Sequence, residues 1–369
     1  MLKEVESGRL VSLDIFRGLT MAAMILVNNP GSWKHVYAPL RHARWHGWTP
    51  TDLIFPFFLF IVGVSLSFSL TKRRKWRSSR QIPWGKILRR TVILFGLGLL
   101  LAWIPKFDLS GLRIPGVLQR IALCYLIASV VFLKTDWKGR TVWVIALGVV
   151  YWLLLKLVPV PGYGAGVLEP EGNLCGYIDV KLLGGHLYTP GFDPEGLLST
   201  LPAVATTLLG SLSGDWLRSV RRKAAGFIGL VLGGAVLTAG GLYLHPYFPI
   251  NKQLWTSSYM LFSGGAAMLV LAACYFTADI LGWKKWSYPF RVFGTNAITA
   301  YVGSGLMARL LFNLKLSGAG QTLKDYITNR WLIPWAGLLN GSLLFGLILI
   351  LVWLLLLAPL YHKRIFIKI

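Results

Sequence analysis

Long apolar runs alternate with short polar segments along almost the whole chain. A helix needs about 20 mostly apolar residues to cross the hydrocarbon core of a bilayer. Runs of this length predict about ten transmembrane helices, and no segment between them is long enough for a separate soluble domain. We therefore expect an all-α integral membrane protein, a polytopic bundle formed by a single domain over residues 1–369. The predicted spans are 11–29, 50–70, 86–104, 116–133, 141–158, 197–213, 224–244, 255–277, 291–311 and 334–360.

The longest segment between spans, at about 159–196, is rich in glycine and proline. These residues favour turns and irregular loops. Within it, the sequence Asp193-Pro194-Glu195-Gly196 is typical of a turn that leads into the next helix. We expect this segment to form the largest loop of the protein.

The composition supports lipid as the main solvent of the helices. Hydrophobic residues make up 55% of the chain, whereas only 14% of the residues are charged. A soluble domain has about 25% charged residues. A surface this poor in charge would not keep a protein of this size in solution.

The formal net charge of +24 comes from basic residues in short clusters between the apolar runs. Loops on the cytoplasmic side of membrane proteins carry an excess of lysine and arginine. With ten spans, the segments on the side of the termini hold 24 of the 38 lysines and arginines, and the opposite loops hold 12. The strongest cluster is Lys72-Arg73-Arg74-Lys75. The distribution predicts cytoplasmic termini and an outer loop at 159–196, and it argues against nucleic acid as a partner.

The first span carries polar side chains that lipid disfavours. Asp14 and Arg17 are three residues apart, so they share one face of a helix and can form an ion pair. Ionisable residues in spans usually face the bundle interior or a watery cavity. The pair is therefore either structural or part of a site near the cytoplasmic end. Asn28 and Asn29 end the span on the outer side, where either can cap the helix or face a site.

Half of the six histidines lie in the segment after the first span, at His35, His42 and His46. Histidine is the side chain best suited to move protons near neutral pH. The spacing leaves open a proton-transferring residue, a histidine without chemical role, and a zinc pair formed by His42 and His46. The sequence around them lacks the metalloprotease pattern, and no cysteine pair has metal-ligand spacing, so no metal is predicted.

Asp52 begins the second span after Thr49-Pro50-Thr51. A carboxylate there stabilises the helix N-terminus through the helix dipole, and it is equally well placed for catalysis. Other polar or amphipathic residues near span ends are candidates to line a cavity. They are Gln119, Arg120, Asn251, Lys252, Trp255, Ser258 and Asn296.

Several stretches, taken in order, resemble one known family. They are residues 13–18, 41–47 with 52–56, 114–120, 249–259 and 293–297. Together they resemble the heparan-α-glucosaminide N-acetyltransferase family of transmembrane acyltransferases and its bacterial relatives, from about residue 9 to the C-terminus. The second stretch matches the family's His-Ala-x-Trp-x-Gly motif, which begins at His42.

The resemblance implies an enzyme that moves an acetyl group from cytosolic acetyl-CoA to the amino group of a glucosaminide-like sugar on the outer side of the membrane. It assigns the family's functional histidine to His42 and aligns the family's asparagine with Asn28. The histidine can act as a general base or accept the acetyl group itself, and the sequence leaves both routes open. Asn28 is expected to donate a hydrogen bond to the thioester oxyanion, and Asp52 is the third expected catalytic residue.

We expect Asp14, Arg17 and Asn296 to bind acetyl-CoA, whose phosphates should stay near the basic cytoplasmic face while the pantetheine arm threads into the bundle. The partners are then acetyl-CoA, an amino-sugar acceptor and membrane lipid, and a homodimer is left open. The expected acceptor-binding residues are Trp45, His46, Arg120, Asn251, Lys252, Trp255 and Ser258.

Two other functions fit the same pattern. One is a carrier or permease for a sugar or cell-wall fragment, which needs polar residues in the bundle but no acyl donor. The other is O-acetylation of a surface glycan, because a histidine base serves a hydroxyl as well as an amine. In each case the expected location is the bacterial inner membrane.

Overall fold

The computed structural model describes residues 10–75, 83–104, 107–314 and 321–367. Within these ranges every regular element is a helix, so the all-α fold class is confirmed. Parts of the segments used in the charge distribution lie outside the described residues. These parts are 1–9, 76–82, 105–106, 315–320 and 368–369.

Fourteen α-helices follow one another along the described chain, and the longest connections between them lie between α1 and α2, between α5 and α6, and between α6 and α7. The first seven are α1 (Val11–Asn28), α2 (Ile54–Lys75), α3 (Trp84–Trp103), α4 (Val117–Lys134), α5 (Trp137–Leu157), α6 (Leu174–Leu183) and α7 (Thr200–Ser219). The others are α8 (Lys223–Leu244), α9 (Ser257–Tyr275), α10 (Tyr288–Thr295), α11 (Ala297–Asn313), α12 (Leu323–Tyr326), α13 (Ile333–Ala336) and α14 (Leu338–His362).

Each of the ten predicted runs coincides with a helix or a pair of helices, but ten separate spans are not confirmed. In the described part of the chain, seven helices are long and apolar enough to cross a membrane. α3 is not among them because Lys86, Arg89 and Arg90 crowd its first turns. The helix predicted at 291–311 is interrupted at Asn296, which leaves a shorter apolar helix in α11. The seven are α1, α2, α4, α5, α8, α9 and α14.

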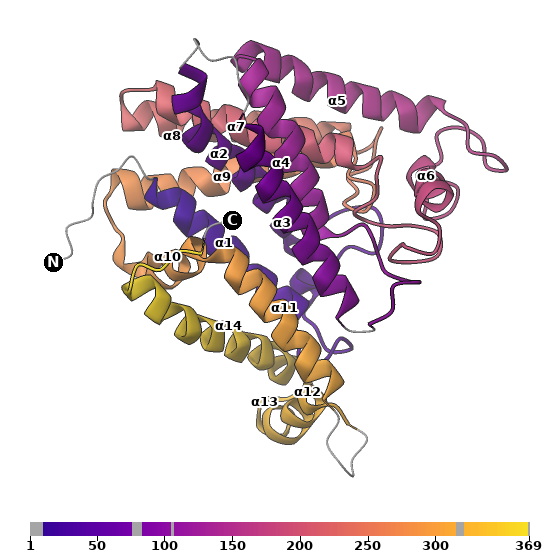
Figure 1. Ribbon diagram of the computed structural model, residues 1–369, viewed down its shortest axis with the longest axis vertical. Helices are drawn as coiled ribbons and strands as arrows, with labels where there is room; N and C mark the ends of the chain where they lie inside the picture. Colours follow the sequence, from indigo (N-terminus) through magenta and orange to yellow (C-terminus); the bar gives the residue numbers. More distant parts are fainter. Residues whose placement is uncertain (1–9, 76–82, 105–106, 315–320, 368–369) are drawn as a thin grey trace.

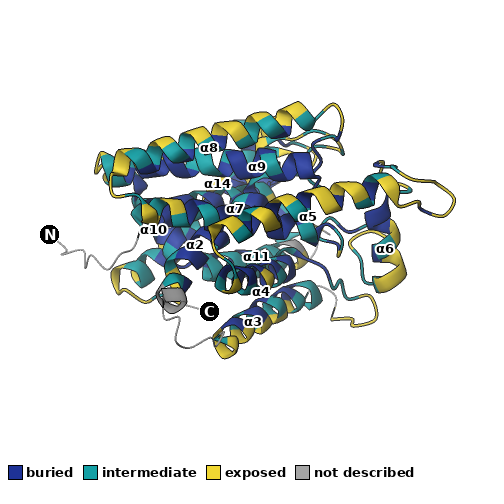
Figure 2. Ribbon diagram, turned by 90° about the horizontal axis from the view of Figure 1, so that it is seen from above, coloured by how far each residue is buried: buried dark blue, intermediate teal, exposed yellow. Residues whose placement is uncertain are grey.

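The long helices run side by side, with α6 beyond one end of the bundle and the N-terminal end of α1 at the other (Figure 2). α1 lies inside, against α2, α9, α10, α11 and α14 (Figure 1). α7 is the second inner helix and contacts α2, α4, α5, α8 and α9. By contrast, only 28% of the apolar window of α5 and 17% of that of α8 is buried, so these helices offer broad apolar faces to lipid.

Glycines let α2 and α7 cross with their backbones in contact. A Cβ atom added at Gly63 of α2 would lie 1.8 Å from the backbone oxygen of Thr207 of α7. One added at Gly210 of α7 would lie 2.0 Å from the backbone oxygen of Phe60 of α2. Small residues allow such close approach between membrane helices. The crossing fixes the start of α2 relative to the segment that leads into α7.

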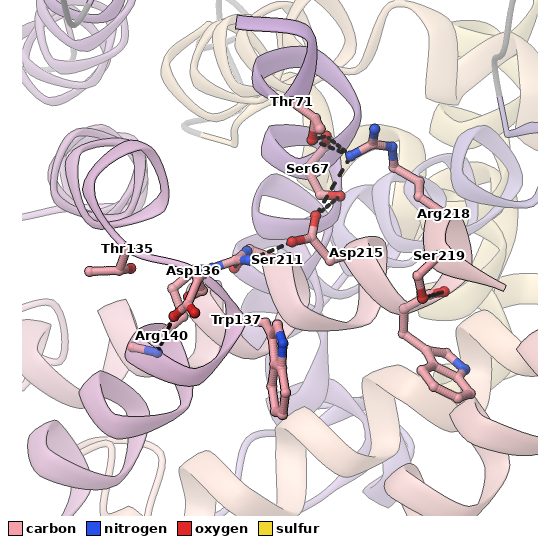
Figure 3. A network of polar contacts seen from close by, with 12 residues as sticks. Ser67, Thr71, Thr135, Asp136, Trp137, Arg140, Ser211, Asp215, Arg218 and Ser219 are labelled. Carbon is pink, nitrogen blue, oxygen red and sulfur yellow. Dashed lines mark hydrogen bonds and ion pairs between the residues drawn. The ribbon is translucent and has the colours of Figure 1, made fainter. Parts of the chain in front are cut away.

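A polar network joins α2, α5 and α7 at the end of the bundle away from α6 (Figure 3). Arg140 of α5 is fully buried, contacts Asp215 of α7, and donates to Ser211 Oγ at 3.2 Å. Asp215 also accepts from Ser67 Oγ of α2 at 2.9 Å. Arg218 donates to the backbone oxygen of Ser67 at 3.0 Å. A buried charge is tolerated when it is paired and hydrogen-bonded, so the network ties three helices together at one level.

Contacts between loops sort them into two layers. In the layer with α6, the backbone nitrogen of Gly47 donates to the oxygen of Ile250 at 2.8 Å. In the other layer, the backbone nitrogen of Ser12 donates to Asp279 Oδ2 at 3.1 Å. These are the same two sets of loops that the lysine and arginine distribution separates. Which layer faces the cytoplasm stays a prediction.

Candidate functional site

The segment between α1 and α2 folds around the carboxylate of Asp52. Residues Pro50–Leu53 form a 3₁₀ turn ahead of α2. Asp52 Oδ2 accepts hydrogen bonds from the backbone nitrogens of Ala43 and Thr49, both at 3.0 Å. The residue is only 1% exposed. One carboxylate oxygen therefore caps the turn, and the other is left for a different partner.

That partner is His42, whose Nδ1 lies 2.6 Å from Asp52 Oδ1. Lys252 Nζ lies 3.1 Å from the same nitrogen and 3.5 Å from Asp52 Oδ1. Because Nδ1 cannot donate to Asp52 and accept from Lys252 at once, we assign its proton to the shorter contact. Nε2 then carries the lone pair, and no residue in the described ranges hydrogen-bonds to it. The His42 side chain is 46% exposed, so a substrate can reach the imidazole.

Lys252 comes from the turn between α8 and α9, far along the chain from His42. The Tyr259 hydroxyl of α9 donates to the backbone oxygen of Asp52 at 2.5 Å. This contact holds the start of α9 against the segment between α1 and α2, which we call the His42 loop. Burial lowers the pKa of Lys252, while the neighbouring carboxylates of Asp52 and Glu195 act to raise it. A partly buried cation thus lies beside the imidazole, and the carboxylate of Asp52, which also orients the ring, is its closest counter-charge.

His46 has a different environment, although it is only four residues away. Asn251 Oδ1 accepts from the backbone nitrogen of Leu254 at 2.9 Å, so the Asn251 amide nitrogen must face His46 Nδ1, at 3.2 Å. His46 Nδ1 therefore accepts, and Nε2 points its proton toward Glu169 Oε1, 3.6 Å away. Both ring nitrogens have neighbours. His42 and His46 therefore have separate partners.

The predicted outer loop packs over the His42 loop. Trp45 Nε1 donates to the backbone oxygen of Leu168 at 2.8 Å. The Trp45 ring meets the Phe192 ring edge-on, with centroids 5.4 Å apart. Trp45 therefore connects the His42 loop with the predicted outer loop, and its ring is occupied by the contact with Phe192.

An ionic cluster that the sequence did not identify as part of a site anchors the end of the same loop. Arg113 donates from Nε and Nη2 to the two oxygens of Asp193, at 2.8 and 2.7 Å, and contacts Glu195. The available signal was the Asp193-Pro194-Glu195-Gly196 turn, which in sequence indicates only a turn. The partner arginine lies about 80 residues earlier, and no sequence spacing connects the two.

A cavity of about 620 Å³ opens in the α6 layer between α1, α3, α4 and α11, and we name it the outer cavity after the predicted orientation. Asn28 lies on its wall and is exposed. His42 is not one of its lining residues, so the cavity and the imidazole are separate surfaces of the same loop layer. The polar side chains of the wall include Asn28, Asn29, Arg113, Gln119, Tyr188, Ser304 and Arg309.

A second cavity, of about 510 Å³, lies toward the other end of the bundle, and we name it the inner cavity after the same prediction. Asp14 and Arg17 line it and form the predicted ion pair, with Oδ1 and Nη1 3.1 Å apart. Arg17 also donates to Ser65 Oγ at 3.0 Å. Arg90 adds a second cation to the wall. The inner and outer cavities meet back to back, because both are lined by Met24, Val117, Leu118 and Tyr301.

Three residues predicted to bind the acceptor are not brought to the exposed imidazole. Arg120 is fully buried and donates to the backbone oxygen of Gly196 at 2.8 Å, so it supports the end of the predicted outer loop. Trp255 and Ser258 are also fully buried. They follow Lys252 closely in sequence, but the start of α9 turns them into the bundle.

Asn296, predicted to bind acetyl-CoA, instead ties down the C-terminal segment. Its amide nitrogen donates to the backbone oxygen of Ile365 at 3.1 Å, and its oxygen accepts from the nitrogen of Ile367 at 2.9 Å. The side chain is 1% exposed and is not part of the inner cavity wall. It sits at the break between α10 and α11, where an amide can satisfy backbone groups.

Comparison with known proteins adds to this geometry. Residues 9–230 match the family described as heparan-alpha-glucosaminide N-acetyltransferase, catalytic. The chain belongs to this family. It is 28% identical to the heparan-alpha-glucosaminide N-acetyltransferase of Mus musculus and 29% identical to that of Homo sapiens, in each case over 428 aligned residues that cover 98% of the chain. The alignments cover 61% and 60% of the two relatives, so the chain spans about three fifths of their length.

The family resemblance carried by the sequence motifs is thereby confirmed. The heparan-alpha-glucosaminide N-acetyltransferase match includes Asn28, His42 and Asp52, and it ends before Asn251 and Lys252. Asn251 and Lys252 nevertheless contact the His42 loop in the fold. They lie within the part of the chain that aligns with the mouse and human N-acetyltransferases as a whole.

Proposed function

We propose that the chain is a membrane-embedded acetyltransferase that transfers the acetyl group of cytosolic acetyl-CoA to the amino group of a glucosaminide-like sugar on the outer side of the membrane. The observation that carries the proposal is the 2.6 Å contact between the accessible His42 and the buried Asp52, in a member of this family. The names of the mouse and human relatives give the same reaction class.

In the proposed reaction, His42 Nε2 takes a proton from the ammonium group of the acceptor, which is not a nucleophile until it loses that proton. The free amine attacks the thioester carbonyl and the new C–N bond forms. The C–S bond then breaks, and the nitrogen's second proton passes to the departing thiolate of CoA, while the first proton is released from His42 to solvent. A general base of this kind contributes about 10²–10⁴-fold to the rate. Asp52 stabilises the imidazolium that forms. The same geometry also serves a route in which the imidazole first accepts the acetyl group.

The two cavities support a path for acetyl-CoA. The inner cavity offers Arg17 and Arg90 to phosphate groups, and its remaining wall is largely apolar, which suits a pantetheine arm. In this proposal an extended arm passes the four residues that line both cavities and reaches the level of Asn28. In this proposal the Asn28 amide donates to the oxyanion that develops on the thioester.

A sugar carrier is the second candidate, because back-to-back cavities also suit a protein that passes a substrate between two sides of a membrane. A carrier does not need to bind acetyl-CoA. Stabilisation of the purified protein against heat by acetyl-CoA separates the two functions, and its absence at millimolar ligand favours the carrier.

His42→Ala and His46→Ala, compared in the full-length purified protein, test the proposed enzyme. We expect His42→Ala to lose about 10²–10⁴-fold in acetyl transfer, or more if the imidazole carries the acetyl group. Thermal stabilisation by acetyl-CoA should be unchanged. His46→Ala should lose far less, since both nitrogens of His46 serve packing contacts. Mass spectrometry of the products from acetyl-CoA and a panel of amino sugars gives the readout, and near-normal turnover of His42→Ala would contradict the assignment.

A further inference from the structure

The outer cavity contains two arginines with different surroundings. Arg113 is compensated by Asp193 and Glu195. Arg309, on α11, donates from Nη1 to the backbone oxygen of Gly305 in its own helix, 2.9 Å away. Its Nε is buried and has no hydrogen-bond partner among the described residues. No carboxylate in the described ranges forms an ion pair with Arg309, so it is an uncompensated cation on the cavity wall.

Some other arginines within the bundle are matched by carboxylates, whereas Arg90 stacks over the Tyr125 ring and the buried Arg120 donates to the backbone oxygen of Gly196. Arg17 pairs with Asp14, and Arg140 pairs with Asp215. An ionisable residue inside the membrane is costly, and it usually pairs with another group or marks the path of a ligand. The described structure provides Arg309 with no carboxylate partner, so we look for the missing anion in a ligand.

The space beside Arg309 suits a small polar ligand. A volume of about 620 Å³ lies within the range of about 300–1,000 Å³ that is typical of ligand sites. Asn28, Gln119 and Ser304 add hydrogen-bonding groups to the wall. A Cβ atom at residue 305 would lie 3.3 Å from Arg309 Nη1, so the glycine there leaves room for the guanidinium.

We propose that Arg309 binds an anionic oxygen group of the acceptor sugar and makes this protein prefer amino sugars that carry a carboxylate, sulfate or phosphate. A guanidinium presents paired donors that match the oxygens of all three anions. The cavity lies in the same loop layer as His42, so a sugar anchored by its anion can direct its amine toward the imidazole. That the ligand is the acceptor rests on the proposed function, but binding of the anion does not require acetyl transfer.

Three sugars with one amino group each test the inference with the full-length protein. They are glucosamine, muramic acid with its carboxylate, and glucosamine 6-phosphate. The wild-type protein should bind at least one acidic sugar about 10- to 100-fold more tightly than glucosamine, as measured by thermal-shift titration and by KM. The comparison of muramic acid with glucosamine 6-phosphate then shows whether the site prefers a carboxylate or a phosphate.

Arg309→Gln should remove this preference and leave the KM for glucosamine nearly unchanged, whereas Arg309→Lys should keep part of it. Arg330→Gln, at an exposed arginine outside the cavity, is the matched control and should behave as wild type. Equal binding of all three sugars by wild-type protein overturns the inference without any variant. A rise in the KM for acetyl-CoA and not for the acceptor in Arg309→Gln overturns it as well. Arg309-dependent binding of an acidic sugar without acetyl transfer supports the anion site and counts against the proposed enzyme.

Discussion

At the scale of single residues, the contact between His42 and Asp52 joins two groups of opposite exposure. The carboxylate is buried and bound by two backbone nitrogens, while the imidazole is nearly half exposed. The carboxylate therefore cannot turn away, and it fixes both the tautomer and the direction of the ring.

Asp52→Asn should leave the protein folded and impair the base. An asparagine can still accept from Ala43 and Thr49 through its oxygen, but its amide nitrogen then faces His42 Nδ1 and favours the tautomer with the proton on Nε2. We expect acetyl transfer to fall by about 10²–10⁴-fold with unchanged stabilisation by acetyl-CoA. Glu171→Gln, at an exposed carboxylate of the outer loop, is the control. An Asp52→Asn protein with normal turnover and a normal pH profile would show that the carboxylate is only a cap.

Asp179 in α6 is a buried carboxyl group whose contribution to folding stability depends on pH. Its Oδ1 accepts from the backbone nitrogen of Leu197 at 2.8 Å, and its Oδ2 has no partner among the described residues. Burial raises the pKa of Asp179 from 3.8 to about 6, with Asp193 adding to the shift and Arg120 opposing it. The folded state thus holds this proton more tightly than the unfolded state, so the contribution of Asp179 to stability falls as pH rises from 3.8 through about 6.

Asp179→Asn removes the ionisable group and keeps an oxygen for Leu197. The Tm of the variant relative to wild type should therefore increase as the pH is raised from about 4 to about 8, and it should level off above the folded-state pKa. Thermal unfolding in detergent at several pH values measures this. A Tm difference that does not change with pH would mean that the pKa of Asp179 is the same in the folded and unfolded states, and it would contradict the raised pKa.

At the scale of helices, close crossings at glycine set the positions of the functional loops. Gly63→Ala puts a methyl group where the backbone oxygen of Thr207 lies, so α2 and α7 must move apart. We expect a lower Tm by several degrees and weaker acetyl transfer, because Asp52 directly precedes α2. Gly96→Ala in α3 is the matched control, since a Cβ atom there meets nothing within 4 Å. Equal Tm values for the two variants would contradict the backbone contact.

The positions of the helices could be predicted from sequence because the length of each apolar run depends only on consecutive residues. The histidine loop and the Asp14–Arg17 pair could also be found, since their members are near in sequence and carry distinctive chemistry. The roles of Arg120 and Asn296 could not, because each is decided by backbone groups from distant segments. Lys252 was expected in a site, but sequence gave no indication that it would contact His42 and Asp52 together.

At the scale of the whole molecule, the two loop layers give the topology a direct test. We expect Ala165→Cys to react with an impermeant thiol reagent in intact cells and Lys138→Cys to react only after the membrane is opened. Both positions are exposed. The three native cysteines are buried, so their background should be low. The reverse labelling pattern would invert the orientation and move the proposed acetyl-CoA entrance to the other side.

The turn between α8 and α9 supplies Lys252 and Asn251 to a loop that was synthesised some two hundred residues earlier. A nascent chain that has inserted only its first helices already contains His42 and Asp52, but nothing yet stands beside them to balance the buried carboxylate or hold His46. The proposed catalytic arrangement can therefore be complete only once α9 has joined the bundle. Fragments that stop before this point have the motif of the family without Lys252 and Asn251 beside it.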